Sequence, residues 1–138
     1  MNNLTVGFTC GAFDLFHAGH VLMLAEAKSI CGVLLVGLQT NPQIDRPGKH
    51  KPIQSVYERQ IQLEACEYVD DIIVYDTERD LENILATLPI DVRILSEEYR
   101  NKPITGEEIC KKRGIEIYYN KRNHDYSTTE LRERIKRG

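Results

Sequence analysis

The sequence lacks the features that mark membrane-spanning, secreted and nucleic-acid-binding chains. No apolar run approaches the roughly 20 residues that a transmembrane helix needs, and the N-terminus has no basic segment followed by a long apolar stretch. Acidic residues outnumber basic ones by 21 to 18, and the resulting net charge of −3 argues against nucleic acid as the main partner. We therefore expect a cytoplasmic protein that binds neither membranes nor nucleic acid.

Closely spaced cysteine pairs are also missing. The four cysteines are far apart in the chain, and most of them lie within or at the end of apolar runs. Thiols of this kind are typically small buried side chains in a reducing compartment. The sequence has no internal repeat or low-complexity segment, and its 138 residues suffice for a real core. We expect a single domain over residues 1–138.

What the sequence does contain is a regular alternation of short apolar runs and helical patterns. Nearly continuous β-branched runs, typical of strands covered on both faces, predict strands at 4–10, 33–39, 71–75, 92–96 and 115–119. Apolar residues at helical spacing predict helices at 20–30, 55–66, 79–88, 105–113 and 128–137. This alternation predicts an α/β fold with a Rossmann-like open parallel five-stranded sheet and helices on both faces. Ligands of such sheets bind beyond the carboxyl ends of the strands.

The junction between the first strand and the first helix carries the strongest functional signal. It reads Gly11-Ala12-Phe13-Asp14-Leu15-Phe16-His17-Ala18-Gly19-His20. Peptide N–H groups at a helix start have no intrahelical partner, and imidazoles that can be cationic near neutral pH add to the positive end of the helix dipole. We interpret His17 and His20 as a phosphate site. The alternatives are a metal-binding pair, or one core histidine and one helix cap.

This segment resembles the HxGH signature of the nucleotidylyltransferase superfamily, and most closely that of glycerol-3-phosphate cytidylyltransferase-like proteins. The resemblance implies that His17 and His20 are catalytic. It also implies a nucleotide-binding loop made of Gly11, Ala12, Phe13, Asp14 and Gly19, in which the glycine lets the backbone approach the ligand closely. For Asp14 we give equal weight to a role as a turn or helix-cap residue.

A second segment lies before the last predicted helix, where Arg122 is followed five residues later by Ser127-Thr128-Thr129. Helix capping by Ser127, with Glu130 at the capping-box position, explains one hydroxyl. It does not require three hydroxyls behind an arginine, and hydroxyls at a helix N-terminus suit phosphate oxygens. The segment resembles the family's second signature, which implies that Arg122 binds nucleotide phosphate and that the three hydroxyl residues form the triphosphate site.

The long connection over residues 40–54 is a third candidate, because loops of this length are usually functional or mobile. It contains a basic run from Arg46 to Lys51 and precedes a helix that carries Arg59. Related enzymes have a lysine in this loop and an arginine early in the next helix. The resemblance therefore implies that Lys49 or Lys51, together with Arg59, offsets phosphate charge. The alternative is a solvated basic loop.

Several positions depart from the cytidylyltransferase pattern. Glu67 stands where many relatives place a cation, Ala12 replaces a threonine, and the run from Ser96 to Tyr99 replaces a Gly-Asp-Asp-Trp-like segment. The sequences His-Ala-Gly-His-Val and Ser-Thr-Thr also resemble those of adenylyltransferases that act on heptose phosphate. The departures leave the base and the acceptor open.

The resemblance implies an enzyme that joins CTP to a small phosphorylated alcohol, with glycerol 3-phosphate as the best choice, and releases pyrophosphate. One alternative is an adenylyltransferase that uses ATP on a sugar phosphate of the heptose type or on a flavin precursor. An alternative of another class is a nucleotide-binding sensor without turnover. Mg²⁺ is expected with the triphosphate because it bridges phosphate oxygens. No metal site built by the protein is expected, and the resemblance implies a homodimer.

Overall fold

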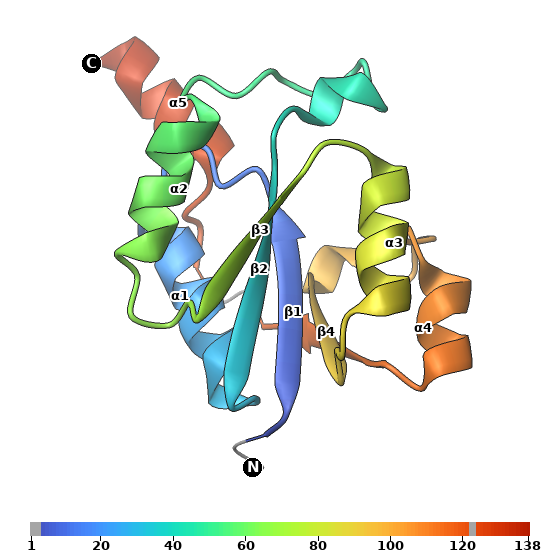
Figure 1. Cartoon of the computed structure of the whole chain (residues 1–138). Helices are drawn as coiled ribbons and strands as arrows, with labels where there is room; N and C mark the ends of the chain where they lie inside the picture. The colour runs from blue at the N-terminus through green and yellow to red at the C-terminus, as the bar shows by residue number, and fades with distance from the viewer. Residues whose placement is uncertain (1–3, 122–123) are drawn as a thin grey trace.

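The computed structural model describes residues 4–121 and 124–138 and contains an open sheet of five parallel strands (Figure 1). The strands are β1 (Val6–Gly11), β2 (Val33–Gln39), β3 (Asp71–Tyr75), β4 (Val92–Ser96) and β5 (Glu116–Asn120). Their order in the sheet is β3-β2-β1-β4-β5, and every neighbouring pair is parallel. The predicted Rossmann-like α/β fold is confirmed.

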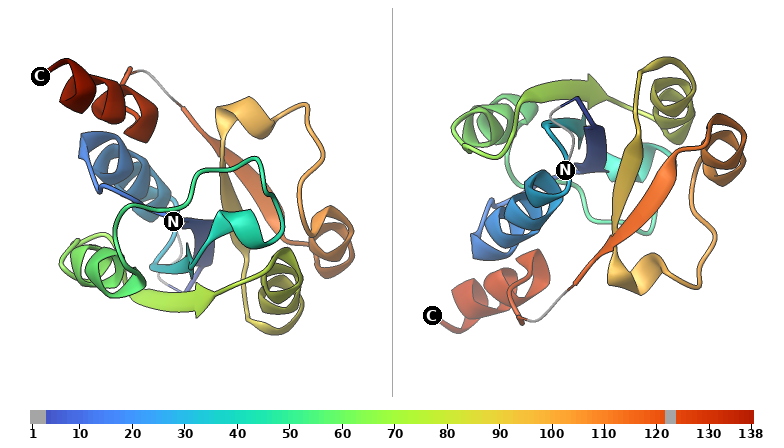
Figure 2. Two further views of the ribbon diagram at one scale, coloured as in Figure 1. Left: turned by 90° about the horizontal axis from the view of Figure 1, so that it is seen from above. Right: turned by 90° about the horizontal axis from the view of Figure 1, so that it is seen from below.

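Helices cover both faces of this sheet. They are α1 (Ala18–Ser29), α2 (Val56–Glu64), α3 (Glu78–Thr87), α4 (Glu107–Arg113) and α5 (Thr128–Arg137), with 3₁₀ turns η1 (Pro42–Ile44) and η2 (Glu97–Tyr99). Helices α1, α2 and α5 lie on one side, and α3 and α4 lie on the other (Figures 1 and 2). Each face therefore has its own apolar core, with Leu24 and Leu63 in one and Leu81 and Leu85 in the other.

The predicted boundaries match the structure closely. Strands β2, β3 and β4 and helix α5 begin and end at the predicted residues, and the other elements differ by a few residues. Helix α1 starts at Ala18, before the predicted His20, because His17 caps it. The four cysteines are free thiols, as expected. Among the described residues, no helix is both long and apolar enough to cross a bilayer.

The strand order places a topological switch beside β1. The chain builds β2 and β3 on one side of β1 and then crosses to build β4 and β5 on the other. The connection that follows β1 therefore runs toward β2, and the connection that follows β4 runs the other way, toward β5. This divergence opens a crevice at the carboxyl edge of the sheet. The histidine segment follows β1 directly, so it begins at this crevice.

Candidate active site

The two histidines shape the start of α1 with their own side chains. His17 has extended backbone angles, and its Nδ1 accepts a hydrogen bond from the Gly19 N–H at 3.0 Å. Nδ1 of His20 accepts from the His17 N–H at 3.1 Å. Since both Nδ1 atoms accept, each neutral ring carries its proton on Nε2. The helix start thus holds two N–H donors whose ring centroids are 3.9 Å apart.

His20 is held in an apolar setting. Its ring stacks on Phe16 and meets Phe13 at a tilt, with ring centroids 5.4 Å away in both cases. Burial lowers the pKa of His20 to about 3, and the neighbouring His17 acts in the same direction. The positive charge that an imidazole can carry near neutral pH is therefore absent from His20 in the ligand-free protein. His20 is a neutral donor.

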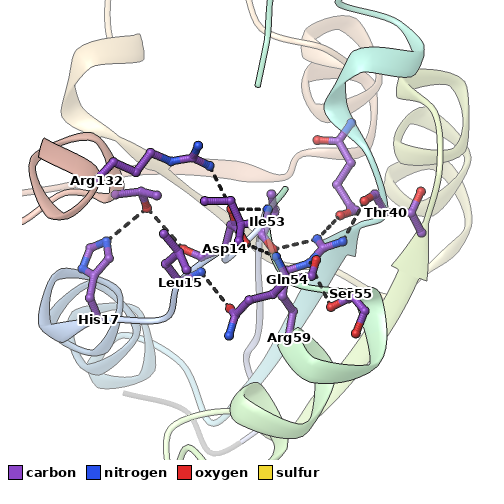
Figure 3. A network of polar contacts seen from close by, with 12 residues as sticks. Asp14, Leu15, His17, Thr40, Ile53, Gln54, Ser55, Arg59 and Arg132 are labelled. Carbon is purple, nitrogen blue, oxygen red and sulfur yellow. Dashed lines mark hydrogen bonds and ion pairs between the residues drawn. The ribbon is translucent and has the colours of Figure 1, made fainter. Parts of the chain in front are cut away.

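His17 also joins the two segments singled out in the sequence. Its Nε2 lies 3.2 Å from Oγ1 of Thr128, and that hydroxyl donates to the Asp14 carbonyl at 3.3 Å (Figure 3). Ser127 caps α5 as predicted, since its Oγ accepts from the Glu130 N–H at 3.0 Å. The N-termini of α1 and α5 therefore meet, although His17 and Thr128 are 111 residues apart.

A cleft of about 420 Å³ opens beside this junction, bounded by α1, the carboxyl ends of β4 and β5, and the start of α5. His17, Gly19, His20, Ser127 and Thr128 line it, so five predicted site residues share one cavity. The sequence interpretation missed most of its other lining residues, among them Met23, Glu26, Asn120, Lys121 and Tyr126. Their positions at one edge of the sheet and along one face of α1 were the available signal.

Gly19 has a packing role beside the close approach to a ligand that is predicted for it. A Cβ atom at this position would lie 2.9 Å from the Tyr126 carbonyl oxygen and 2.8 Å from Cε1 of His17. Contacts this short force the backbone apart. The glycine therefore lets the start of α1 pack against the segment before α5 and leaves room for the His17 ring.

Asp14 is neither a helix cap nor a free ligand in this structure. Its carboxylate accepts from the Ile53 and Gln54 N–H groups at 2.8 and 2.9 Å, and it pairs with Arg132 Nη2 at 2.9 Å. The backbone around it is strained, because Phe13 and Leu15 adopt φ values of +50° and +52°. Asp14 thus clamps the loop after β1 to the start of α2 and to α5 (Figure 3).

The structure corrects the prediction that Arg59 offsets phosphate charge. The side chain is only 1% exposed, and its guanidinium donates to backbone carbonyls (Figure 3). The acceptors are Ala12, Gln39, Thr40, Gln54 and Ser55. Burial lowers the pKa of Arg59, and the nearby Asp14 opposes that shift. Arg59 ties the ends of β1 and β2 to α2, so its donors are already committed.

Other predicted residues lie outside the cleft. Lys49 and Lys51 are exposed in the loop after β2 and do not line it. Thr129 turns toward a separate pocket between that loop and α5, which it shares with Arg132. Arg122 lies outside the described residues.

Of the remaining predicted positions, Gly11 and Ala12 contribute backbone at the end of β1, and the Ala12 carbonyl serves Arg59. Phe13 packs in the core below His20. Glu67 lies between α2 and β3, before the amino end of that strand, and it does not line the cleft.

The metal-pair alternative for the histidines gains no support from the described residues. No group of three or more His, Cys, Asp and Glu side chains gathers there in a way that could hold an ion. The site instead offers neutral N–H donors, hydroxyls and a helix start, which suit anionic oxygens.

Comparison with known proteins agrees with this geometry. A family model described as "Cytidylyltransferase-like" matches residues 8–134. "Bifunctional protein HldE" of Hyphomonas neptunium is 35% identical over 136 residues, and that of Campylobacter jejuni subsp. jejuni serotype O:6 is 32% identical. Both alignments cover 98% of this chain and 28% of the relative, so the chain spans little more than a quarter of these curated proteins.

Solved structures share the fold. The lipopolysaccharide core biosynthesis protein from Thermoplasma volcanium superposes with a TM-score of 0.69 at 24% identity, covering 86% of this chain and 98% of that one. Pantothenate synthetase from Thermus thermophilus superposes with a TM-score of 0.59 at 13% identity, covering 97% of this chain and 66% of that one. With the family model matching nearly all of its length, the chain belongs to the cytidylyltransferase-like family of nucleotidyltransferases.

Proposed function

We propose that the protein is an adenylyltransferase that transfers AMP from ATP to a phosphorylated sugar and releases pyrophosphate. The observation that carries nucleotidyl transfer is the pair of neutral Nε2–H donors at the start of α1, joined to the start of α5 in one cleft. The choice of ATP and a sugar phosphate has a different basis. The matching relatives are HldE proteins, which favours the heptose-phosphate alternative over CTP and glycerol 3-phosphate.

The chemistry needs no nucleophile from the enzyme, because the acceptor phosphate is itself the nucleophile. One of its oxygens forms a bond to the α-phosphorus of the nucleotide while the bond to the pyrophosphate oxygen breaks. The obstacle is charge, since a phosphate dianion must approach a tetra-anionic triphosphate. Catalysis is then positioning and stabilisation of the charge that develops on the phosphoryl oxygens.

His17 and His20 are suited to that task. Their Nδ1 atoms are occupied by backbone N–H groups, which fixes the rings and leaves Nε2–H as the donor of each, with that of His17 against the Thr128 hydroxyl. In the proposed complex, the two donors hold the α-phosphate oxygens, and these hydrogen bonds strengthen as negative charge grows there. His17 exchanges Thr128 for the phosphate, while the Thr128 hydroxyl keeps its bond to the Asp14 carbonyl.

Cations on this side of the sheet would offset the remaining charge. Lys121 lines the cleft, and Arg132 lies beside Asp14 on α5 with its side chain 25% exposed. Arg122, Lys49 and Lys51 keep the phosphate roles that the family resemblance implies. Mg²⁺ fits here as an ion that the nucleotide carries. Among the described residues, Glu98 is the one carboxylate lining the cleft that makes no hydrogen bond, so it could coordinate the ion. Phosphate oxygens would supply further ligands of the Mg²⁺. The bound ion would neutralise the triphosphate and assist pyrophosphate release.

A matrix of substrates tests the proposal directly. ATP, CTP, GTP and UTP are each incubated with heptose phosphate, other sugar phosphates and glycerol 3-phosphate, and pyrophosphate release is measured. We expect the highest kcat/KM for ATP with a sugar phosphate. Turnover confined to CTP and glycerol 3-phosphate would restore the first interpretation. Nucleotide binding without turnover on any acceptor would favour a sensor.

A further inference from the structure

The side chain of Asn120 has a hydrogen-bonding capacity that the protein itself does not use. Asn120 is the last residue of β5 and lines the cleft, yet it is only 5% exposed. Its Oδ1 is shielded from solvent and, among the described residues, has no hydrogen-bond donor. Buried carbonyl oxygens are nearly always paired, because leaving one unpaired is costly.

The orientation of this amide is fixed by α1. Asn120 Nδ2 donates to the Met23 carbonyl at 3.3 Å, and a carbonyl can accept only from the nitrogen end of an amide. Oδ1 must therefore face away from α1. The amide cannot rotate to satisfy its oxygen without losing this bond.

The surroundings of Asn120 are firmly built. One turn further along α1, Glu26 accepts from the Tyr118 hydroxyl at 2.8 Å and from the Lys121 N–H at 3.0 Å. Ser96 is the partner of Asn120 in the β4–β5 ladder, so both side chains stand on the same face of the sheet, and both line the cleft. Side chains of α1 and β5 thus hold the two elements together at residues that line the cleft, and Figure 2 shows the helix and the strand from above and below.

We propose that Asn120 Oδ1 accepts a hydrogen bond from the exocyclic amino group of the nucleobase, so that the site selects adenine or cytosine against bases with an oxo group there. The inference rests on the proposed nucleotidyl transfer and names the group that reads the base. His17 and His20 define the phosphate end of the cleft, and Asn120 lies in its wall beside Met23. Met23 and Leu22 line the same cleft and offer apolar contact to a base.

Adenine and cytosine share an amino group at the equivalent position, whereas hypoxanthine, guanine and uracil carry a carbonyl. An amino group gives Oδ1 the donor that it lacks. An oxo group instead brings two acceptors together and leaves Asn120 Oδ1, which is shielded from solvent, without a donor. A site built to hydrogen-bond one substrate group rejects the analogue without it strongly.

The test compares nucleotides that differ only in this group. We measure kcat/KM and, by calorimetry without acceptor, Kd for the pairs ATP and ITP, and CTP and UTP. The wild-type protein should favour the amino member of its preferred pair by about 10- to 100-fold. Comparison of the Kd values for ATP and CTP then shows whether the site prefers adenine or cytosine. Equal Kd values within both pairs would overturn the inference.

The Asn120→Leu variant then assigns the effect to this side chain. It should reduce the ATP-to-ITP ratio to less than about 3-fold. Gln62→Leu is the matched control, because Gln62 Oε1 on α2 is also buried and unpaired but lies outside the cleft. The control should keep the wild-type ratio. A ratio that Asn120→Leu leaves intact would mean that another group reads the base.

These outcomes separate the inference from the proposed function. If no nucleotide is turned over but ATP binds more tightly than ITP and Asn120→Leu removes that difference in Kd, the transferase proposal fails and the assignment of Asn120 stands. If ATP and ITP are used equally well with a sugar phosphate, the transferase proposal stands and the assignment fails. Should Asn120→Leu not fold in a thermal melt, equal Kd values within both wild-type nucleotide pairs would still overturn the inference.

Discussion

The site has two neighbouring regions that are rich in polar side chains and differ in how their hydrogen bonds are used. In the clamp formed by Asp14, Arg59 and Arg132, the Asp14 carboxylate accepts from backbone N–H groups and pairs with Arg132, and the Arg59 guanidinium donates to backbone carbonyls. In the cleft, Nε2 of His17 meets the hydroxyl of Thr128, another lining residue, and Asn120 Oδ1 has no donor among the described residues. Backbone groups hold the first region, whereas the second contains an acceptor that the described part of the protein leaves unmatched.

The comparison shows why charge near a sheet edge is a poor guide to ligand contact. A buried arginine is stable only when its donors are paired, and once they are paired by carbonyls they cannot also hold a phosphate. The clamp instead fixes the strained loop that places the histidines. The predictions below test this division of labour, from the largest expected effect to the smallest.

Removing the clamp's central donor should unfold the protein rather than slow it selectively. Arg59→Met removes the guanidinium donor from the carbonyl oxygens of Ala12, Gln39, Thr40 and Gln54, while the Ser55 carbonyl keeps the backbone N–H of residue 59. Each buried unpaired group costs about 1–3 kcal/mol. We expect a loss of about 3–5 kcal/mol in the free energy of unfolding, measured by urea denaturation. The control is Arg79→Met at an exposed position on α3, which should change stability by less than about 0.5 kcal/mol. An Arg59→Met variant that is stable but cannot bind nucleotide would show that Arg59 is a ligand after all.

Replacing His17 by asparagine should lower activity and leave stability nearly unchanged, because asparagine preserves the helix cap. His17→Asn removes the Nε2–H donor but keeps a side-chain oxygen for the Gly19 N–H. We expect kcat to fall by about 10²–10³-fold, as for loss of one preorganised donor, with stability nearly unchanged. His50→Asn, in the exposed loop after β2, should leave kcat at the wild-type value. Full turnover by His17→Asn would remove the histidine from the mechanism.

The sequence predicted the fold and the position of the histidine segment, because both follow from local patterns and strand alternation. Apolar runs and their alternation determined the strands, and the segment after β1 had to lie at the carboxyl edge of the sheet. The fate of Arg59 was not accessible in the same way. Whether a guanidinium points outward or binds carbonyls from three elements depends on packing between residues far apart in sequence. Asn120 was missed for the same reason, since its unpaired oxygen exists only once α1 lies against β5.

The neutral state of His20 should make stability depend on pH. Burial lowers the pKa of His20 to about 3, whereas the unfolded chain takes up this proton near pH 6.5. Below that value the unfolded state binds more protons, so stability should fall by about 1.4 kcal/mol per pH unit as the pH drops from 6 toward 4. Urea denaturation of the wild type and of His20→Phe, which keeps an aromatic ring between Phe13 and Phe16, measures the difference in slope. Equal slopes would mean that His20 titrates normally.

The exposed lysines should contribute only modestly to nucleotide binding, because their attraction to the triphosphate acts through solvent. Lys49 and Lys51 lie outside the cleft, so any attraction to the triphosphate acts at long range. Lys49→Ala and Lys51→Ala should each raise the KM for nucleotide by no more than about 5-fold, and the effect should shrink as salt increases. A loss of kcat by two orders of magnitude in either variant would mean that the loop moves and places that lysine on the substrate.

The smallest effect on nucleotide binding is expected for Glu67→Arg, although the family resemblance suggests that this position affects it. Many relatives carry a cation at this position, so restoring one with Glu67→Arg would tighten nucleotide binding if the position faced the substrate. In this protein Glu67 is exposed in the loop that leads into the amino end of β3. The cleft lies at the carboxyl edge of the sheet, so the two are separated by about the length of a strand, roughly 15–20 Å. That separation exceeds the Debye length of about 8 Å at physiological ionic strength, so the added charge is screened. We expect KM for ATP and CTP to change by less than about 2-fold at 0.15 M salt. A selective drop in the KM for CTP would place Glu67 beside the nucleotide, as a second copy of the chain could do, and would break the division between the cleft and the rest of the surface.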